Sequence, residues 1–185
     1  MAMLILDELF KTVILFIGGN YIWDYLPLHL CSINIFTIAW HAWKPSNFLG
    51  NFLYTICIPG ALAALLFPSW ASLPVTSGMH IHSFTVHILL VMYPVVLTVA
   101  GDIKPDWKLI PKCMGLLVIL AALNLCVNLL LDTNFMFLMY ADPGNPLALF
   151  EQMWGSHLLG FPVIIVGVLL VMHLPFIIYK KLKKR

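Results

Sequence analysis

Residues 109–131 read LIPKCMGLLVILAALNLCVNLLL, a run in which Lys112 is the sole charged residue. A helix needs about 20 predominantly apolar residues to cross a hydrocarbon core about 30 Å thick. This run is long enough, and it lacks the strict alternation of apolar and polar residues that is typical of a transmembrane β-strand. The stretch therefore predicts a membrane-spanning helix.

The rest of the chain repeats this pattern. Of the 185 residues, 62% are hydrophobic and 10% are charged, whereas about a quarter of the residues in a soluble domain are charged. We expect one all-α domain over residues 1–185, a polytopic membrane helix bundle of about six transmembrane helices. The predicted spans are residues 3–20, 25–43, 49–67, 83–100, 109–131 and 157–179.

Positive charge predicts the orientation of the bundle, because Lys and Arg gather in cytoplasmic loops. Lys11 is expected near the inner end of the first span. With six spans and both termini cytoplasmic, the other nine basic residues all fall on the cytoplasmic side. These are Lys44, Lys104, Lys108, Lys112, Lys180, Lys181, Lys183, Lys184 and Arg185. The net charge of +2 then reflects topology, and it does not support nucleic acid as a partner.

Several helices place polar residues at one predicted depth, just below the outer interface. Cys31 lies about six residues inside the second span, whose first turn is expected to contain Pro27. His87 lies about four residues inside the fourth span, and Asn128 and His157 lie at the outer ends of the last two. Intramembrane polar groups indicate a functional site by default, although they also form structural hydrogen bonds between helices.

One chemistry that polar residues at this depth could perform is nucleophilic catalysis. Cys31 with His87 could form a nucleophile and base, because an adjacent imidazole helps to generate the reactive thiolate. Asn34, on the same helical face as Cys31, or Asn128 could orient the imidazole or bind an oxyanion. His29 lies about 200° around the helix from Cys31, so a regular helix would not point both residues inward.

Two alternatives remain open on the residues alone. The first is a zinc or transition-metal site built from histidines, which would use His29, His80, His82 and His87. The second is a non-enzymatic bundle that binds or transports a small ligand, since prolines inside the spans can kink helices around a cavity. For the catalytic interpretation we expect no metal and no cofactor.

Four stretches carry a resemblance to a known family. They are LPLHLCSINIF (26–36), GALAALLFP (60–68), HSFTVHILLVMYPVVL (82–97) and VNLLLDTNFMFLMYADPGNPL (127–147). The chain resembles the YwaF-like family of small bacterial integral membrane proteins. That family is similar to the animal transmembrane ether-phospholipid acyltransferase family and, more remotely, to membrane hydrolases of fatty-acid esters.

The resemblance implies an activity and a site. It implies a lipid acyltransferase or acyl-ester hydrolase of the bacterial cytoplasmic membrane that acts near the outer leaflet on a phospholipid or another acyl lipid. Cys31 would be the nucleophile and His87 its histidine partner, with His29 and Asn134 as further motif positions. The full set of expected supporting or substrate-binding residues is His29, Asn34, His80, His82, Asn128 and Asn134.

Overall fold

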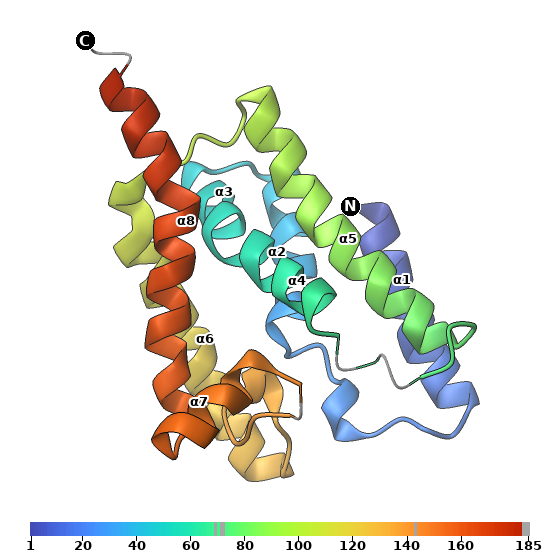
Figure 1. The fold of residues 1–185 in the computed structure, drawn as a ribbon. Coiled ribbons are helices and arrows are strands. Elements are labelled where there is room, and N and C mark those ends of the chain that lie inside the picture. Colours follow the sequence, from blue (N-terminus) through green and yellow to red (C-terminus); the bar gives the residue numbers. More distant parts are fainter. Residues whose placement is uncertain (69, 71–72, 143, 183–185) are drawn as a thin grey trace.

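The computed structural model describes residues 1–68, 70, 73–142 and 144–182, without the side chains of residues 179–182 (Figure 1). This part of the chain contains helices and no strand, as predicted. The α-helices are α1 (Ala2–Ile17), α2 (Leu30–Trp43), α3 (Asn47–Phe52), α4 (Ile58–Leu66), α5 (Gly78–Ala100), α6 (Ile110–Leu131), α7 (Pro146–Trp154) and α8 (Gly160–Leu182). The basic tail Lys183–Arg185 and the side chains of Lys180 and Lys181 lie outside the described residues.

Within these residues, four helical segments are long and apolar enough to cross a membrane. They are Asn47–Leu66, Gly78–Ala100, Trp107–Leu131 and His157–Ile178. They correspond to the last four predicted spans and agree with a multi-pass membrane protein. The first two predicted spans form shorter helices, α1 with 16 residues and α2 with 14. At 1.5 Å per residue these helices are about 24 and 21 Å long, so six full-length spans are not found.

The chain between α1 and α2 explains why these helices are short. α1 stops before Gly18, and Gly19 adopts a positive φ of 66°. Pro27 does not lie in the first turn of α2, contrary to expectation, because Leu26 before it is extended, with ψ of 145°, as a residue preceding proline prefers. His29 is extended as well, and α2 begins only at Leu30.

The helix that precedes the Pro68–Ser77 connection is continuous but irregular. Residues Leu53–Cys57 form a π-helical segment between α3 and α4. Pro59 lacks an amide hydrogen and its ring crowds the carbonyl four residues earlier, at Thr55, so the wider turn relieves a clash. Two side chains of this segment hold α8. The Tyr54 hydroxyl donates to Met172 O at 2.6 Å, and Thr55 Oγ1 lies 3.1 Å from His173 Nε2.

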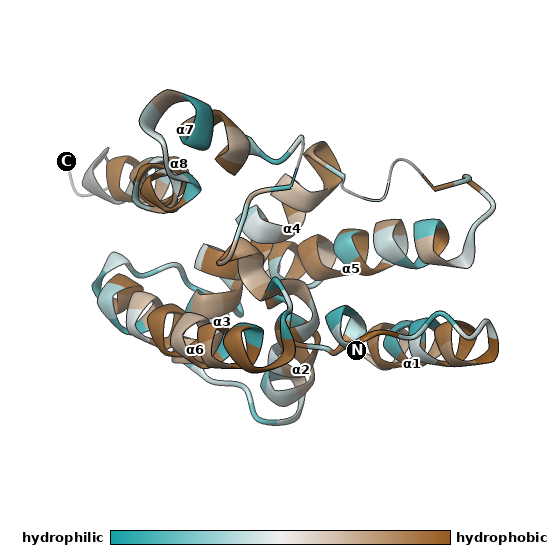
Figure 2. Ribbon diagram, turned by 90° about the horizontal axis from the view of Figure 1, so that it is seen from below, coloured by the Kyte–Doolittle hydropathy of each residue, from teal (hydrophilic) through white to brown (hydrophobic). Residues whose placement is uncertain are grey.

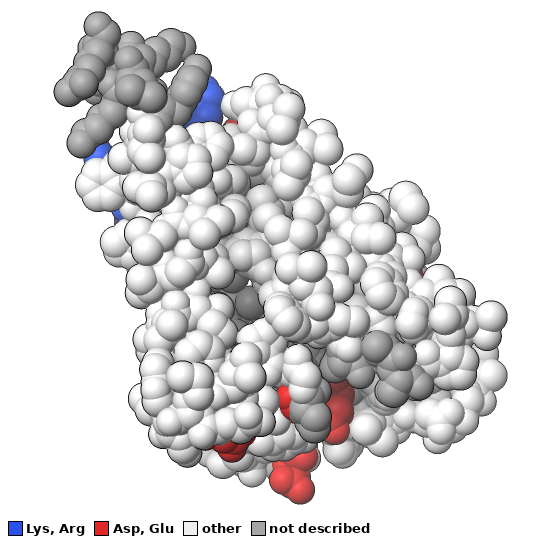
Figure 3. Space-filling view, in the orientation of Figure 1, with Lys and Arg blue, Asp and Glu red and all other residues white. Residues whose placement is uncertain are grey.

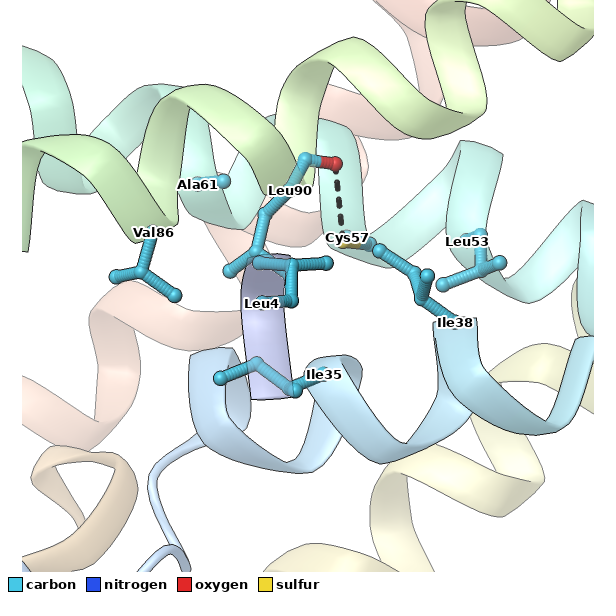
Figure 4. Packing of buried hydrophobic residues seen from close by; sticks show 8 residues of the cluster. All are labelled: Leu4, Ile35, Ile38, Leu53, Cys57, Ala61, Val86 and Leu90. Atoms are coloured by element: carbon cyan, nitrogen blue, oxygen red, sulfur yellow. Dashed lines mark hydrogen bonds between the residues drawn. The ribbon is translucent and has the colours of Figure 1, made fainter. Parts of the chain in front are cut away.

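The main apolar core forms where α1, α2, α5 and the α3–α4 helix meet. α1 packs along α5, with Ile14 and Phe10 against Gly78, so the two helices run antiparallel. Figure 4 shows the buried side chains that close this junction, namely Leu4, Ile35, Ile38, Leu53, Cys57, Ala61, Val86 and Leu90. Seen from below, α7 and α8 lie together on the side away from α1, and α4 lies between this pair and α1 (Figure 2).

Charged residues separate toward the two ends of the helices. Exposed Lys44, Lys104, Lys108 and Lys112 lie in or next to the α2–α3 and α5–α6 connections, which we call the basic end. Figure 3 shows the larger acidic patches at the opposite, or acidic, end. Lys11 does not follow the expected pattern. It is buried in the middle of α1, toward the acidic half of α5, where it pairs with Glu8.

Candidate active site

Cys31 and His87 meet where α2 and α5 pass each other on the acidic side of the core. The distance between Cys31 Sγ and His87 Nε2 is 3.1 Å. Cys31 is the second residue of α2, and His87 is the tenth residue of α5. Because α5 begins at Gly78 and not at residue 83, His87 lies deeper in its helix than expected. Because α2 begins late, Cys31 lies nearer its helix start than expected, and the two residues still reach one level.

The second nitrogen of His87 establishes how the imidazole is protonated. Nδ1 lies 2.5 Å from the carbonyl oxygen of Ser83, one turn earlier on α5. A carbonyl only accepts hydrogen bonds, so Nδ1 carries the hydrogen and donates it. In the neutral ring Nε2 is then an acceptor, and it faces the Cys31 thiol. The backbone of α5 thus orients the imidazole toward the sulfur, as a general base requires.

The pair borders the apolar core. Cys31 is half-buried and packs against the cluster that contains Ile35, one turn along α2, and Val86, next to His87. His87 is 7% exposed. All four cysteines lie in the described residues and are free, so no disulfide links Cys31 to the exposed Cys126, and the sulfur of Cys31 contacts His87.

An aromatic residue from the α4–α5 connection covers the pair. The rings of Trp70 and His87 are stacked, with centroids 4.9 Å apart and planes 15° from parallel. Phe84, one turn before His87, meets Trp70 edge to face at 5.8 Å. Trp70 was not among the residues predicted from the sequence, because it follows the end of α4, where no helical periodicity relates it to the other helices.

Asn34 lies one turn after Cys31 on the same face of α2, as predicted. It is 2% exposed, and its side-chain oxygen has no hydrogen-bond partner among the described residues. Oxygen and nitrogen of an amide are assigned by their partners, so rotation of this group would present a donor in place of the unpaired oxygen. Asn34 thus places an unpaired polar group one turn from Cys31.

His29 packs against the segment that follows α6. It is the residue immediately before α2, and its ring packs edge-on against Phe135 at 5.1 Å and tilted against Phe137 at 6.1 Å. The contacts of His29 are thus with the segment after α6, and His87 is the histidine that contacts Cys31.

Asn128 and Asn134 organise the segment that follows α6. Asn128 accepts hydrogen bonds from Thr133 Oγ1 and Phe135 N and donates to Phe135 O. Asn134 accepts from Met139 N and donates to Tyr140 O. These bonds hold a backbone in which Met136 and Phe137 have φ of 60° and 56°, values that non-glycine residues rarely adopt. Both amides are satisfied locally and do not contact the Cys31–His87 pair.

His80 and His82 lie in α5, not in the preceding loop as expected. His82 turns toward α1, where its Nδ1 is 3.2 Å from an Asp7 carboxylate oxygen and its Nε2 is 3.9 Å from Glu8. His80 packs against Phe84, with ring centroids 5.0 Å apart. In the part of the chain that the structure describes, no group of three or more His, Cys, Asp or Glu side chains could hold a metal ion.

The fold and these residues describe a class of protein: a multi-pass helical membrane protein with a cysteine and a histidine in contact inside the bundle. Comparison with known families then assigns the chain. A family model described as the TMEM164 family matches residues 1–173, and the chain belongs to this family. The YwaF-like family, which the motifs resemble, is not the family found. No curated protein and no solved structure shows significant similarity to the chain.

Proposed function

We propose that the protein is an integral membrane lipid acyltransferase or acyl-ester hydrolase with Cys31 as nucleophile and His87 as general base. One observation carries this proposal above all: His87 Nε2 lies 3.1 Å from Cys31 Sγ while Nδ1 is held by Ser83 O. An imidazole so oriented can remove the thiol proton, and the thiolate is the form that attacks an ester.

The reaction follows from this geometry in two steps. First, the Cys31 proton passes to His87 Nε2 as sulfur bonds to the acyl carbon. The tetrahedral intermediate collapses, the ester C–O bond breaks, and the leaving alcohol takes the proton from His87. Second, His87 removes a proton from an acceptor hydroxyl, which attacks the thioester and releases Cys31 as a thiol. A lysolipid acceptor makes the protein a transferase, and water makes it a hydrolase.

The position of the pair suits a lipid ester. Cys31 is the second residue of α2, on the acidic side of the core, so it is nearer that end of the bundle than the basic end. Lipid esters lie at the boundary of headgroups and acyl chains, at the edge of a hydrocarbon core about 30 Å thick. The substrate class we propose is therefore a membrane phospholipid or another acyl lipid.

The proposed topology has both termini and the basic end in the cytoplasm of a bacterium, and the active site near the outer leaflet. Exposed Lys44, Lys104, Lys108 and Lys112 support it through the positive-inside rule. We also propose that α1 and α2 complete six crossings. They run between the same two ends as the longer helices, and a short helix can be accommodated by local thinning of the bilayer.

The test is direct detection of the thioester. The purified protein in lipid nanodiscs is mixed with p-nitrophenyl octanoate, and its intact mass is measured before and after hydroxylamine, which cleaves thioesters. We expect one octanoyl adduct that is absent from Cys31→Ala and present in Cys126→Ala, the control at an exposed cysteine. An adduct that persists in Cys31→Ala contradicts the proposal, and a wild-type protein without adduct favours a binding or transport bundle.

The acceptor is identified with the same acyl-enzyme. Octanoyl-Cys31 protein is isolated and its decay is followed in buffer alone and with lysophosphatidylcholine. Faster decay with formation of an octanoyl phospholipid assigns a transferase. Equal decay with release of octanoate assigns a hydrolase.

A further inference from the structure

The tryptophan stacked on His87 offers a hydrogen-bond donor that no residue described by the structure accepts. Trp70 Nε1 is buried and has no hydrogen-bond partner among the described residues. In an inference that rests on the proposed function, we propose that the indole N–H of Trp70 donates to the carbonyl oxygen of the acyl substrate as Cys31 attacks. Trp70 would then be a catalytic residue of the same site.

The other tryptophans differ from Trp70 in their surroundings. Trp23, Trp40, Trp43, Trp107 and Trp154 are all large exposed side chains, between 48% and 80% accessible. Exposed tryptophans are expected at membrane interfaces, where the indole N–H reaches water or headgroups. Trp70 is only partly exposed and its nitrogen is shielded, so the usual interfacial role does not explain it.

The packing of Trp70 places its ring against the imidazole that contacts Cys31. Its ring lies parallel to the imidazole at 4.9 Å, and that imidazole touches Cys31 Sγ at 3.1 Å. Phe84 supports the indole from the side at 5.8 Å. The rings of His87 and Phe84 thus hold Trp70 against the imidazole of the Cys31–His87 pair.

The reaction would supply an acceptor for the indole N–H, which has none among the described residues. When sulfur bonds to the acyl carbon, the carbonyl π electrons move to oxygen and form an oxyanion, and they return when the ester C–O bond breaks. A fixed donor that meets this charge accelerates the step most where water is excluded. A buried N–H without a hydrogen-bond partner destabilises the fold. An unpaired indole N–H at this position is therefore consistent with a substrate that accepts its hydrogen bond.

A purely structural role for the Trp70 ring makes a different prediction from the role of a donor to the oxyanion. Two reactions of Cys31 distinguish these roles. Octanoylation by p-nitrophenyl octanoate passes through an oxyanion, whereas alkylation by iodoacetamide does not. Both reactions need the thiolate and therefore His87. A donor to the oxyanion affects the first reaction alone, and a ring that merely positions His87 affects both.

The decisive variant removes the indole N–H and retains an aromatic ring. Trp70→Phe keeps an aromatic ring over His87, and Trp107→Phe is the control at an exposed tryptophan near the basic end. We expect Trp70→Phe to slow octanoylation about 100-fold through kcat more than KM, with the alkylation rate unchanged. Trp107→Phe should leave both rates at the wild-type value.

Other results overturn the inference. Wild-type octanoylation in Trp70→Phe, or an equal loss of both reactions, removes the oxyanion role while the Cys31 thioester in the wild type still supports the proposed function. If Trp70→Phe does not fold, benzothienylalanine is incorporated at position 70, because it keeps the shape of indole and replaces N–H with sulfur. The same selective loss of octanoylation is expected, and its absence rejects the inference.

Discussion

His82 of α5 lies 3.2 Å from the Asp7 carboxylate of α1 through its Nδ1, and the neighbouring Glu8 carries the ion pair to Lys11. Glu8 and Lys11 are 9% and 6% exposed. A polar junction within an apolar bundle thus joins α1 to the helix that carries His87. The active-site geometry depends on α5, so this junction supports it from the side opposite α8.

Breaking the Glu8–Lys11 ion pair should lower the stability of the protein. Lys11→Met leaves the Glu8 carboxylate buried without its cation, and we expect a loss of about 3 to 5 kcal/mol in the free energy of unfolding. The double variant Glu8→Gln with Lys11→Met removes both charges and should recover most of that loss. Denaturant unfolding in detergent micelles measures all three proteins, with exposed Lys112→Met as control. If Lys11→Met were as stable as the wild type, the Glu8–Lys11 ion pair would not be what holds α1 in place.

Asn128 should matter more for stability than Asn124, although both lie on the same face of α6. Asn128→Leu leaves the buried Phe135 N–H without its acceptor, which we expect to cost about 1 to 3 kcal/mol. The described bond of Asn124 is to Met136 Sδ, a weak acceptor, so Asn124→Leu should cost less. Thermal unfolding of the two variants compares them. Equal losses would mean that the segment after α6 does not depend on Asn128.

Two glycines of α8 provide a second matched pair. A Cβ at Gly160 would lie 2.6 Å from the Phe150 ring, whereas a Cβ at Gly167 meets no atom within 4 Å. Gly160→Ala should force α7 from α8 and destabilise the protein by about 1 to 3 kcal/mol. Gly167→Ala should be neutral or stabilising by up to about 1 kcal/mol, because alanine favours helix. A melting temperature unchanged in Gly160→Ala would contradict this packing.

Sequence reasoning found the long helices because their apolar runs are unmistakable, as residues 109–131 illustrate. It misjudged helix starts, since Pro27 keeps Leu26 extended while α5 extends back to Gly78. Cys31 therefore lies nearer the start of its helix than predicted and His87 farther from the start of its own, yet the expected proximity of the two residues is found.

Other features of the site depend on contacts that spacing does not encode. Lys11 was assigned to the inner end because the positive-inside rule counts charges and cannot foresee the pair with Glu8. Asn128 and Asn134 were grouped with the reacting residues by depth, yet they bind the backbone of their own segment. Trp70 comes from a connection with no periodic pattern, so only the fold brings it to His87.

The dependence of Cys31 acylation on His87 tests the central claim most directly. The initial rate of octanoyl-Cys31 formation is measured for the wild type, for His87→Gln and for the control His41→Gln. His41 lies farther along α2 than Cys31 and contacts Tyr93 of α5. Loss of a general base should slow His87→Gln by about 10² to 10⁴-fold, while His41→Gln keeps the wild-type rate. Equal rates in the wild type and His87→Gln would contradict the assignment of His87 as the base for Cys31.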